Sequence, residues 1–278
     1  MIFIKIYNQI IINHEKRGRK MILDIKKAEK EFLKYVKNFD ETESKINLKK
    51  QHSIRVMNIS NQIAKTIFKD EKQIELASLI GLLHDIARFE QYTKYKTFND
   101  LESFDHGDYG VEILKKDNYI RKFIKTDKYD NIILKAIENH NKFQIEKGLT
   151  EEELAYSKLI RDADKLDIFY EACTLFYKDQ KYKIENSKIS KYIEKDFKEK
   201  KIIKREKGKR IDGIDNVLST IAFVFDLNYK ESFKILKKED YINKIFNQFD
   251  FKFDETKEKV KELKKLTSDY IEEKIHNE

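Results

Sequence analysis

A histidine and an aspartate stand side by side at the end of an apolar stretch. Residues 79–88 read Leu-Ile-Gly-Leu-Leu-His-Asp-Ile-Ala-Arg, with the pair at His84 and Asp85. Burying a carboxylate in such a setting costs several kcal/mol unless a partner compensates for its charge. A divalent metal ion would be such a partner, because imidazole and carboxylate groups are ligands of catalytic transition metals. A helix end capped by a histidine would show the same pair, so the pair alone leaves both interpretations open.

The other histidines favour the interpretation as a metal site. His52 shares a helical stripe with Val56, Ile59, Ile63 and Ile67, so it should face the core. A single core histidine is more often a hydrogen-bonded structural residue than a ligand. However, only the two histidines near the chain ends, His14 and His276, lie away from core stripes and apolar helix boundaries. The remaining members of the set are His84, His106 and His140.

Three aspartates in a later helix also indicate a buried cation. Asp162, Asp164 and Asp167 lie among Ile and Leu residues within a predicted helix over 151–176. Aspartate is a poor helix former, so at least one of these carboxylates should face a buried cation.

The elements that position these residues should all be helices. The chain has no proline and 7 glycines in 278 residues, and its apolar residues recur at helical spacing. Residues 91–105 lack clear periodicity and are predicted to form a loop or lid. The predicted helices cover 24–39, 48–68, 71–84, 130–139, 151–176, 214–225, 229–236, 241–249 and 255–275, with another beginning at His106.

Composition narrows the class of protein. A hydrophobic content of 40% is enough for a globular core. The single cysteine, Cys173, excludes an intramolecular disulfide framework, and no uncharged apolar run reaches the about 18 residues of a membrane span. We therefore expect a cytoplasmic protein.

The order His52, His84-Asp85, His106, His140 and Asp164 resembles the HD-domain superfamily of metal-dependent phosphohydrolases. The resemblance covers about residues 48–177 and implies an all-α HD-domain helical bundle. It implies that His52, His84, Asp85 and Asp164 hold a metal. Asp164 is preferred to Asp162 because the family's late aspartate is typically followed by a basic and then an apolar residue, here Lys165 and Leu166. His106 and His140 match positions that hold a second metal or contact substrate phosphate.

Two features depart from the family pattern. Ala87 stands where many relatives have glycine, and Asn141 stands where the cyclic-dinucleotide phosphodiesterase branch has a second histidine. The Gly-Tyr-Pro signature of that branch cannot occur in a chain without proline. The resemblance therefore disfavours cyclic dinucleotides as substrates.

The remaining segments divide the chain. Residues 1–20 are expected to be a translated leader or disordered, 21–177 the HD domain, and 211–278 a C-terminal helical extension. Residues 178–210 hold 14 Lys and Arg against 6 Asp and Glu. This basic linker or surface segment is more often a solvated surface than a nucleic-acid site.

The resulting expectation is a phosphohydrolase that acts on a phosphorylated small molecule, for which we predict a nucleotide. One or two divalent ions (Mn, Fe, Co or Ni, with Mg or Zn as further candidates) would activate water for attack on phosphorus, and Asp85 or Asp164 would orient that water. Arg88 and Lys165 are candidates for neutralising phosphate charge, although Arg88 could equally form a surface ion pair. The alternative is a nucleotide sensor or RNA-binding module that keeps the metal without significant turnover.

Overall fold

The computed structural model describes residues 23–204, 211 and 213–276. The expected leader, residues 1–20, lies outside them. The described residues form helices, joined by loops and one isolated β-bridge between Leu23 and Ile124, so the all-α prediction is confirmed. None of the described helices combines the length and apolar character that a membrane span requires.

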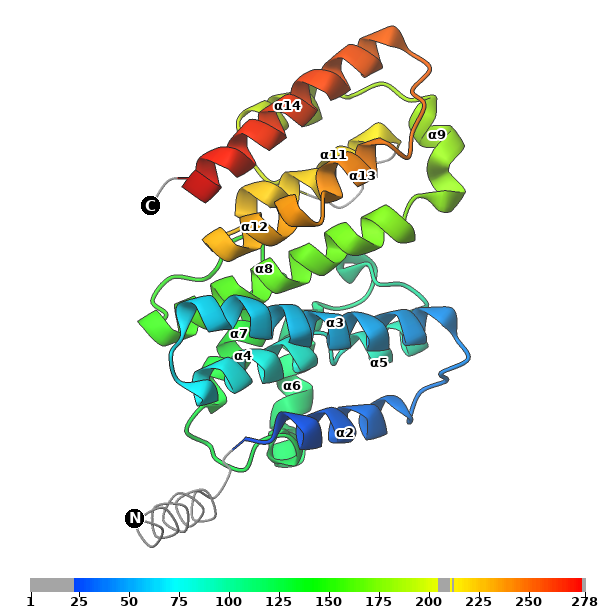
Figure 1. The fold of residues 1–278 in the computed structure, drawn as a ribbon. Helices are drawn as coiled ribbons and strands as arrows, with labels where there is room; N and C mark the ends of the chain where they lie inside the picture. The colour runs from blue at the N-terminus through cyan, green and yellow to red at the C-terminus, as the bar shows by residue number, and fades with distance from the viewer. Residues whose placement is uncertain (1–22, 205–210, 212, 277–278) are drawn as a thin grey trace, which may run out of the picture.

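The elements follow one another closely along the chain (Figure 1). The α-helices are α2 (Ile25–Val36), α3 (Ser44–Ile67), α4 (Glu71–Leu83), α5 (Arg88–Tyr95), α6 (His106–Lys115), α7 (Asp130–Asn139), α8 (Glu151–Thr174), α9 (Lys181–Glu185), α10 (Lys191–Lys198), α11 (Ile214–Ile221), α12 (Lys230–Lys238), α13 (Tyr241–Phe246) and α14 (Asp254–His276). Short 3₁₀ helices are η1 (Asp100–Glu102), η2 (Lys116–Lys122), η3 (Lys178–Gln180) and η4 (Ala222–Asp226).

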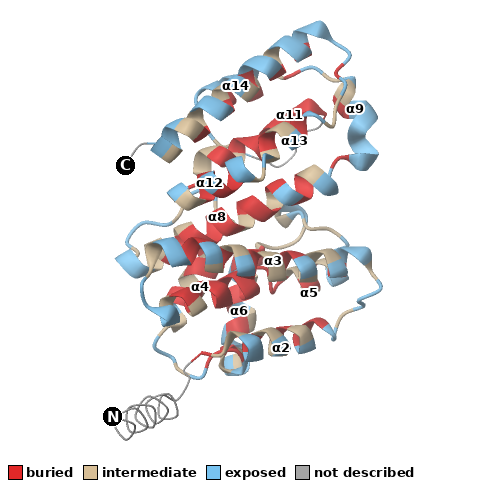
Figure 2. Cartoon of the chain, viewed as in Figure 1, coloured by how far each residue is buried: buried red, intermediate tan, exposed pale blue. Residues whose placement is uncertain are grey.

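Helix α4 is the buried centre of the N-terminal bundle, as its sequence predicts. Ile74 and every residue from Leu76 to Leu83 are buried, and α4 packs along α3 (Figure 2). Asp70 caps its first turn by accepting a hydrogen bond from the Lys72 backbone amide at 3.1 Å. The apolar helix therefore ends inside the bundle and delivers His84 and Asp85 to the interior.

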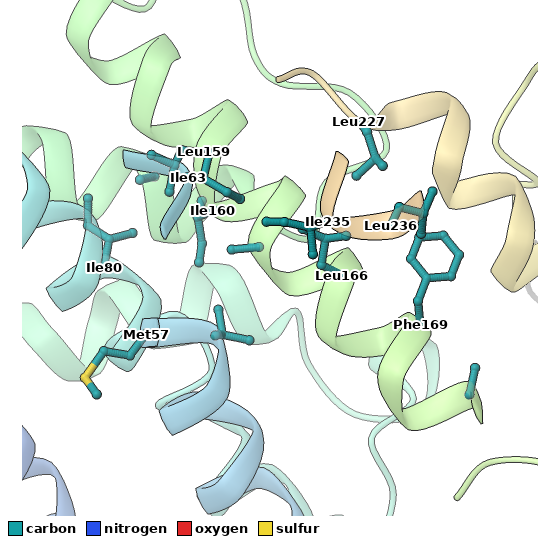
Figure 3. Packing of buried hydrophobic residues seen from close by; sticks show 14 of the residues in the cluster. Met57, Ile63, Ile80, Leu159, Ile160, Leu166, Phe169, Leu227, Ile235 and Leu236 are labelled. Carbon is teal, nitrogen blue, oxygen red and sulfur yellow. The ribbon is translucent and has the colours of Figure 1, made fainter. Parts of the chain in front are cut away.

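Helix α8 joins the two halves of the molecule. One side packs on α3, α4 and α7, and the other on α11, α12 and α13, so α8 lies between these layers (Figure 1). Leu159 and Ile160 lie toward Ile63, whereas Phe169 lies toward Leu236 (Figure 3). A capping box, in which Thr150 and Glu153 exchange hydrogen bonds, starts this helix. Both layers thus share one hydrophobic core through α8.

The segment predicted as a loop over 91–105 is partly helical. Helix α5 continues to Tyr95 because Phe89 and Gln91 are buried, and Gln91 donates hydrogen bonds to Asp100 and Ser103. The remaining loop, Lys96 to Asp105, contains the short helix η1.

The described part of the basic segment, 178–204, packs against the C-terminal helices. Ile184, Ile193 and Phe197 are fully buried there. Several of its lysines pair with acidic side chains of α14, including Lys198 with Glu262 at 3.0 Å. These ion pairs offset part of the positive charge that the sequence alone displays.

Candidate metal centre

Three helices and one turn bring four of the predicted ligands together. His52 comes from the middle of α3, His84 from the end of α4, Asp85 from the turn that follows, and Asp164 from α8. The Nε2 atoms of His52 and His84 lie 3.2 Å apart, and Asp164 Oδ1 lies 3.1 and 3.6 Å from them. Asp85 Oδ2 lies 3.4 and 3.6 Å from the same nitrogens. These four residues are called the first ligand group below; each of the two carboxylates approaches both histidine nitrogens.

The other oxygen of Asp85 faces a second group. Its Oδ1 lies 3.4 Å from His106 Nε2 and 3.6 Å from His140 Nε2, and these two nitrogens are 3.0 Å apart. His106 is the first residue of α6, and His140 follows the last residue of α7. Asp85, His106 and His140 form the second ligand group, and Asp85 bridges the two groups.

Each histidine is held from behind through its other ring nitrogen. His52 Nδ1 lies 2.6 Å from Asp167 Oδ2, and His106 Nδ1 lies 2.5 Å from Asp100 Oδ2. The Nδ1 atoms of His84 and His140 face the carbonyl oxygens of residues 81 and 137, at 2.8 and 2.6 Å. These acceptors favour a proton on Nδ1, so that each Nε2 atom points into the cluster and can offer its lone pair to a cation.

This arrangement fits a metal ion. Within each histidine pair, two Nε2 lone pairs face each other and repel unless a cation lies between them. A metal with bonds of about 2.1 Å places neighbouring ligand atoms about 3.0–3.4 Å apart, close to the observed separations of 3.0–3.6 Å. The donor set also matches a divalent transition metal, because it holds imidazole and carboxylate groups and no thiolate.

The pKa values of the histidines in the cluster also indicate a site for positive charge. Burial and the Lys49 charge disfavour protonation of His52, but hydrogen bonds with Asp164 and Asp167 outweigh them and raise its pKa to about 9. Burial lowers the pKa of His84, and burial together with Arg88 lowers that of His106 to about 4. A proton on His52 therefore supplies positive charge where a metal would otherwise do so.

Two basic side chains border the cluster. Lys49 Nζ lies 2.7 Å from Asp85 Oδ2, and Arg88 Nε lies 3.4 Å from Asp85 Oδ1. Arg88 also donates to Asp100 Oδ1 at 2.9 Å and to the Phe98 carbonyl at 2.7 Å. Arg88 thus forms ion pairs with Asp85 and Asp100, and its role in binding phosphate stays a prediction. Burial would raise the pKa of Asp85, but Lys49, His84, His140 and Arg88 together hold it well below its usual value.

The structure places Lys165 and Asp162 outside the two ligand groups. Lys165 Nζ lies 2.8 Å from Asp226 Oδ2 and faces the C-terminal layer, and burial beside Arg161 lowers its pKa. Asp162 accepts hydrogen bonds from Asn228, Tyr229 and Ser232 and does not contact a histidine ligand. The role of Lys165 in binding phosphate stays a prediction.

Sequence reasoning missed several residues around the cluster. Lys49 lies one helical turn before His52, a spacing that could have indicated a shared face. Asp167 is one of the three aspartates noted in the predicted helix over 151–176, but its contact with the ring of His52 was not predicted. Asp100 gave no such signal, because a loop carries it to His106.

Comparison with known proteins agrees with this geometry. The family model of the HD domain matches residues 50–168, a range that includes all six residues of the two ligand groups. Searches of curated proteins and of solved structures gave no significant match. HD domains are all-α and bind divalent metals, and the described residues of this chain contain clustered His and Asp side chains that could hold such an ion. The match over residues 50–168 therefore supports membership of this chain in the HD-domain superfamily.

Proposed function

We propose that this protein is a metal-dependent phosphohydrolase that uses two divalent ions to hydrolyse a phosphorylated small molecule, most simply a nucleotide. The observation that carries the proposal is the position of Asp85. Its two oxygens face two separate pairs of histidine Nε2 atoms, and every one of these histidines is oriented through Nδ1. A purely structural His-Asp pair would need neither the second histidine pair nor the partners behind it.

Exposure indicates where substrate reaches the cluster. The side chains of Asp164, Lys49 and Arg88 are 17%, 14% and 13% exposed, whereas those of the four histidine ligands are at most 5% exposed. A phosphate that enters on this side meets Lys49 and Arg88 as cations. Divalent ions held by the ligand groups supply Lewis-acid activation of water and of the phosphoryl group.

The protein's own residues then have distinct roles. Lys49 and Arg88 neutralise phosphate charge, which increases toward the transition state. Asp164, the most exposed carboxylate of the two ligand groups, orients the attacking water. Lys165 is a further candidate for phosphate binding if it exchanges its partner Asp226 for substrate. The bond cleaved is a phosphomonoester, phosphodiester or pyrophosphate bond.

The test begins with metal-free protein reloaded separately with Mn, Fe, Co, Ni, Mg and Zn. Each form is assayed for phosphate release from nucleoside mono-, di- and triphosphates and from diesters. We expect the wild type to turn over substrate with at least one metal. Asp85→Ala should retain no metal and should lose this turnover. His106→Ala and His140→Ala should keep one ion and turn over more slowly. Metal retention without hydrolysis of any substrate would instead support a nucleotide sensor.

A further inference from the structure

The turn that carries His140 is held by a buried guanidinium. Arg161 Nη1 donates to three backbone carbonyls in and after the last turn of α7, those of Asn139 at 3.0 Å, His140 at 3.3 Å and Lys142 at 2.5 Å. Arg161 lies on α8 and is 2% exposed. The last carbonyls of a helix have no partner within the helix, and a positive charge there is favourable. One side chain thus fixes the backbone on which His140 stands.

The other edge of the same guanidinium is held by the C-terminal layer. Arg161 Nε and Nη2 lie 3.1 and 2.6 Å from Asp226 Oδ2, at the end of η4. Two residues further on, Asn228 donates to Asp162, which fastens this segment to α8. Docking of the C-terminal layer therefore sets the orientation of Arg161.

The turn also reaches the other histidine of the second ligand group. Asn141 Nδ2 donates to Asp105 Oδ1 at 2.9 Å and to Asp100 Oδ2 at 3.2 Å. Asp105 caps the helix that begins at His106, and Asp100 contacts His106 Nδ1. The turn fixed by Arg161 is thus connected to both histidines of the second group.

The first ligand group has its own supports. His52 and His84 belong to α3 and α4, and the carboxylate behind His52, Asp167, is held by Arg55 Nε at 2.5 Å. None of the hydrogen bonds found for Arg161 in the described residues involves these residues.

We propose that Arg161 is a positioning residue that couples docking of the C-terminal layer to the second ligand group, so that loss of the Arg161–Asp226 contact weakens the metal site at His106 and His140 selectively. The inference rests on the two-ion part of the proposed function. It assigns the C-terminal extension a role in building the HD-domain site.

The experiment titrates metal-free, full-length protein with Mn²⁺, using calorimetry for stoichiometry and affinity and electron paramagnetic resonance for the coupled ion pair. The variants are Arg161→Lys, which loses the forked geometry, and Asp226→Asn, which keeps Arg161 but weakens its anchor. Arg121→Lys is the matched control. Arg121 also donates hydrogen bonds to a backbone carbonyl, that of Thr126, and to an aspartate, Asp130, and neither residue belongs to a ligand group. His140→Ala serves as the reference for loss of the second site.

We expect Arg161→Lys and Asp226→Asn to bind the first ion as the wild type does, and the second about 10- to 100-fold more weakly, the usual effect of removing a partner behind a ligand. Their resonance spectra should resemble that of His140→Ala, while Arg121→Lys should match the wild type. If Arg161→Lys does not fold, Asp226→Asn decides the question.

Two results would overturn the inference without touching the proposed function: both variants bind two ions with wild-type affinity, or both sites weaken equally. Failure of the wild type to bind a second ion would instead remove the two-ion function together with the inference.

Discussion

Asp162 and Asp164 are two residues apart on α8 and occupy opposite environments. Asp162 is fully buried and accepts hydrogen bonds from the backbone amides of Asn228 and Tyr229 and from the Ser232 hydroxyl. Asp164 instead lies beside the Nε2 atoms of His52 and His84. Residues two apart on an α-helix point about 200° apart, so α8 places one carboxylate in each layer.

The surroundings change the chemistry of the same side chain. Burial raises the pKa of Asp162 despite its donors. Burial would also raise the pKa of Asp164, but the hydrogen bonds with His52 and His84 hold it well below the usual value. The Asp162 carboxylate is satisfied by donors within the protein, whereas Asp164 faces the Nε2 atoms of His52 and His84, which can share a cation with it. Metal binding should therefore depend on Asp164 and not on Asp162.

The largest effect is expected when the carboxylate of Asp164 is removed. Asp164→Ala removes a ligand oxygen, so metal affinity and turnover should fall by more than about 100-fold, the upper end of what even a partner behind a ligand contributes. Elemental analysis of the purified variant and phosphate release measure both. Full metal retention by Asp164→Ala would show that Asp164 is not a ligand.

The sequence predicts the six residues that the structure brings into one cluster, because helical spacing places His52 on a core stripe and the family resemblance orders the others. It also favours Asp164 over Asp162. Their roles as ligands stay a proposal. Helix α5 extends into the predicted loop because Gln91 finds partners in a later segment, which no local pattern reveals.

Contacts between distant segments could not be predicted from the sequence for the same reason. The contact of Arg161 with Asp226 joins segments 65 residues apart. Asp100 reaches His106 through an irregular loop, so neither helical spacing nor composition indicates the pair.

A second effect concerns pH and sharpens the contrast in metal-free protein. The pKa of His52 is about 9 in the folded protein against an ordinary value of 6.5. The stability from its proton is complete below pH 6.5 and is lost as pH rises to 9, a decrease of about 3 kcal/mol. Urea unfolding at pH 6, 7.5 and 9 measures it. Asp164→Asn should flatten this decline, because it weakens a hydrogen bond that favours the charged imidazole.

The wild type loaded with metal is the control for this pH series. The ion takes the place of the proton at His52, so the decline between pH 6.5 and 9 should be smaller than without metal. Equal pH dependence with and without metal would argue against an ion at this position.

The smallest effect is expected at Asp162. Asp162→Asn replaces one acceptor oxygen with an amide NH₂ group. This group faces the hydrogen-bond donors of Asn228 or those of Tyr229 and Ser232, so the free energy of unfolding should fall by about 2 kcal/mol. Metal content and turnover should persist, because Asp162 touches no histidine ligand. Urea unfolding and elemental analysis of the same preparation separate the two properties, with Asp164→Asn as the matched variant in the other layer. Should Asp162→Asn lose its metal while Asp164→Asn keeps it, the two aspartates would have to exchange roles, and the first ligand group would have to be rebuilt around Asp162.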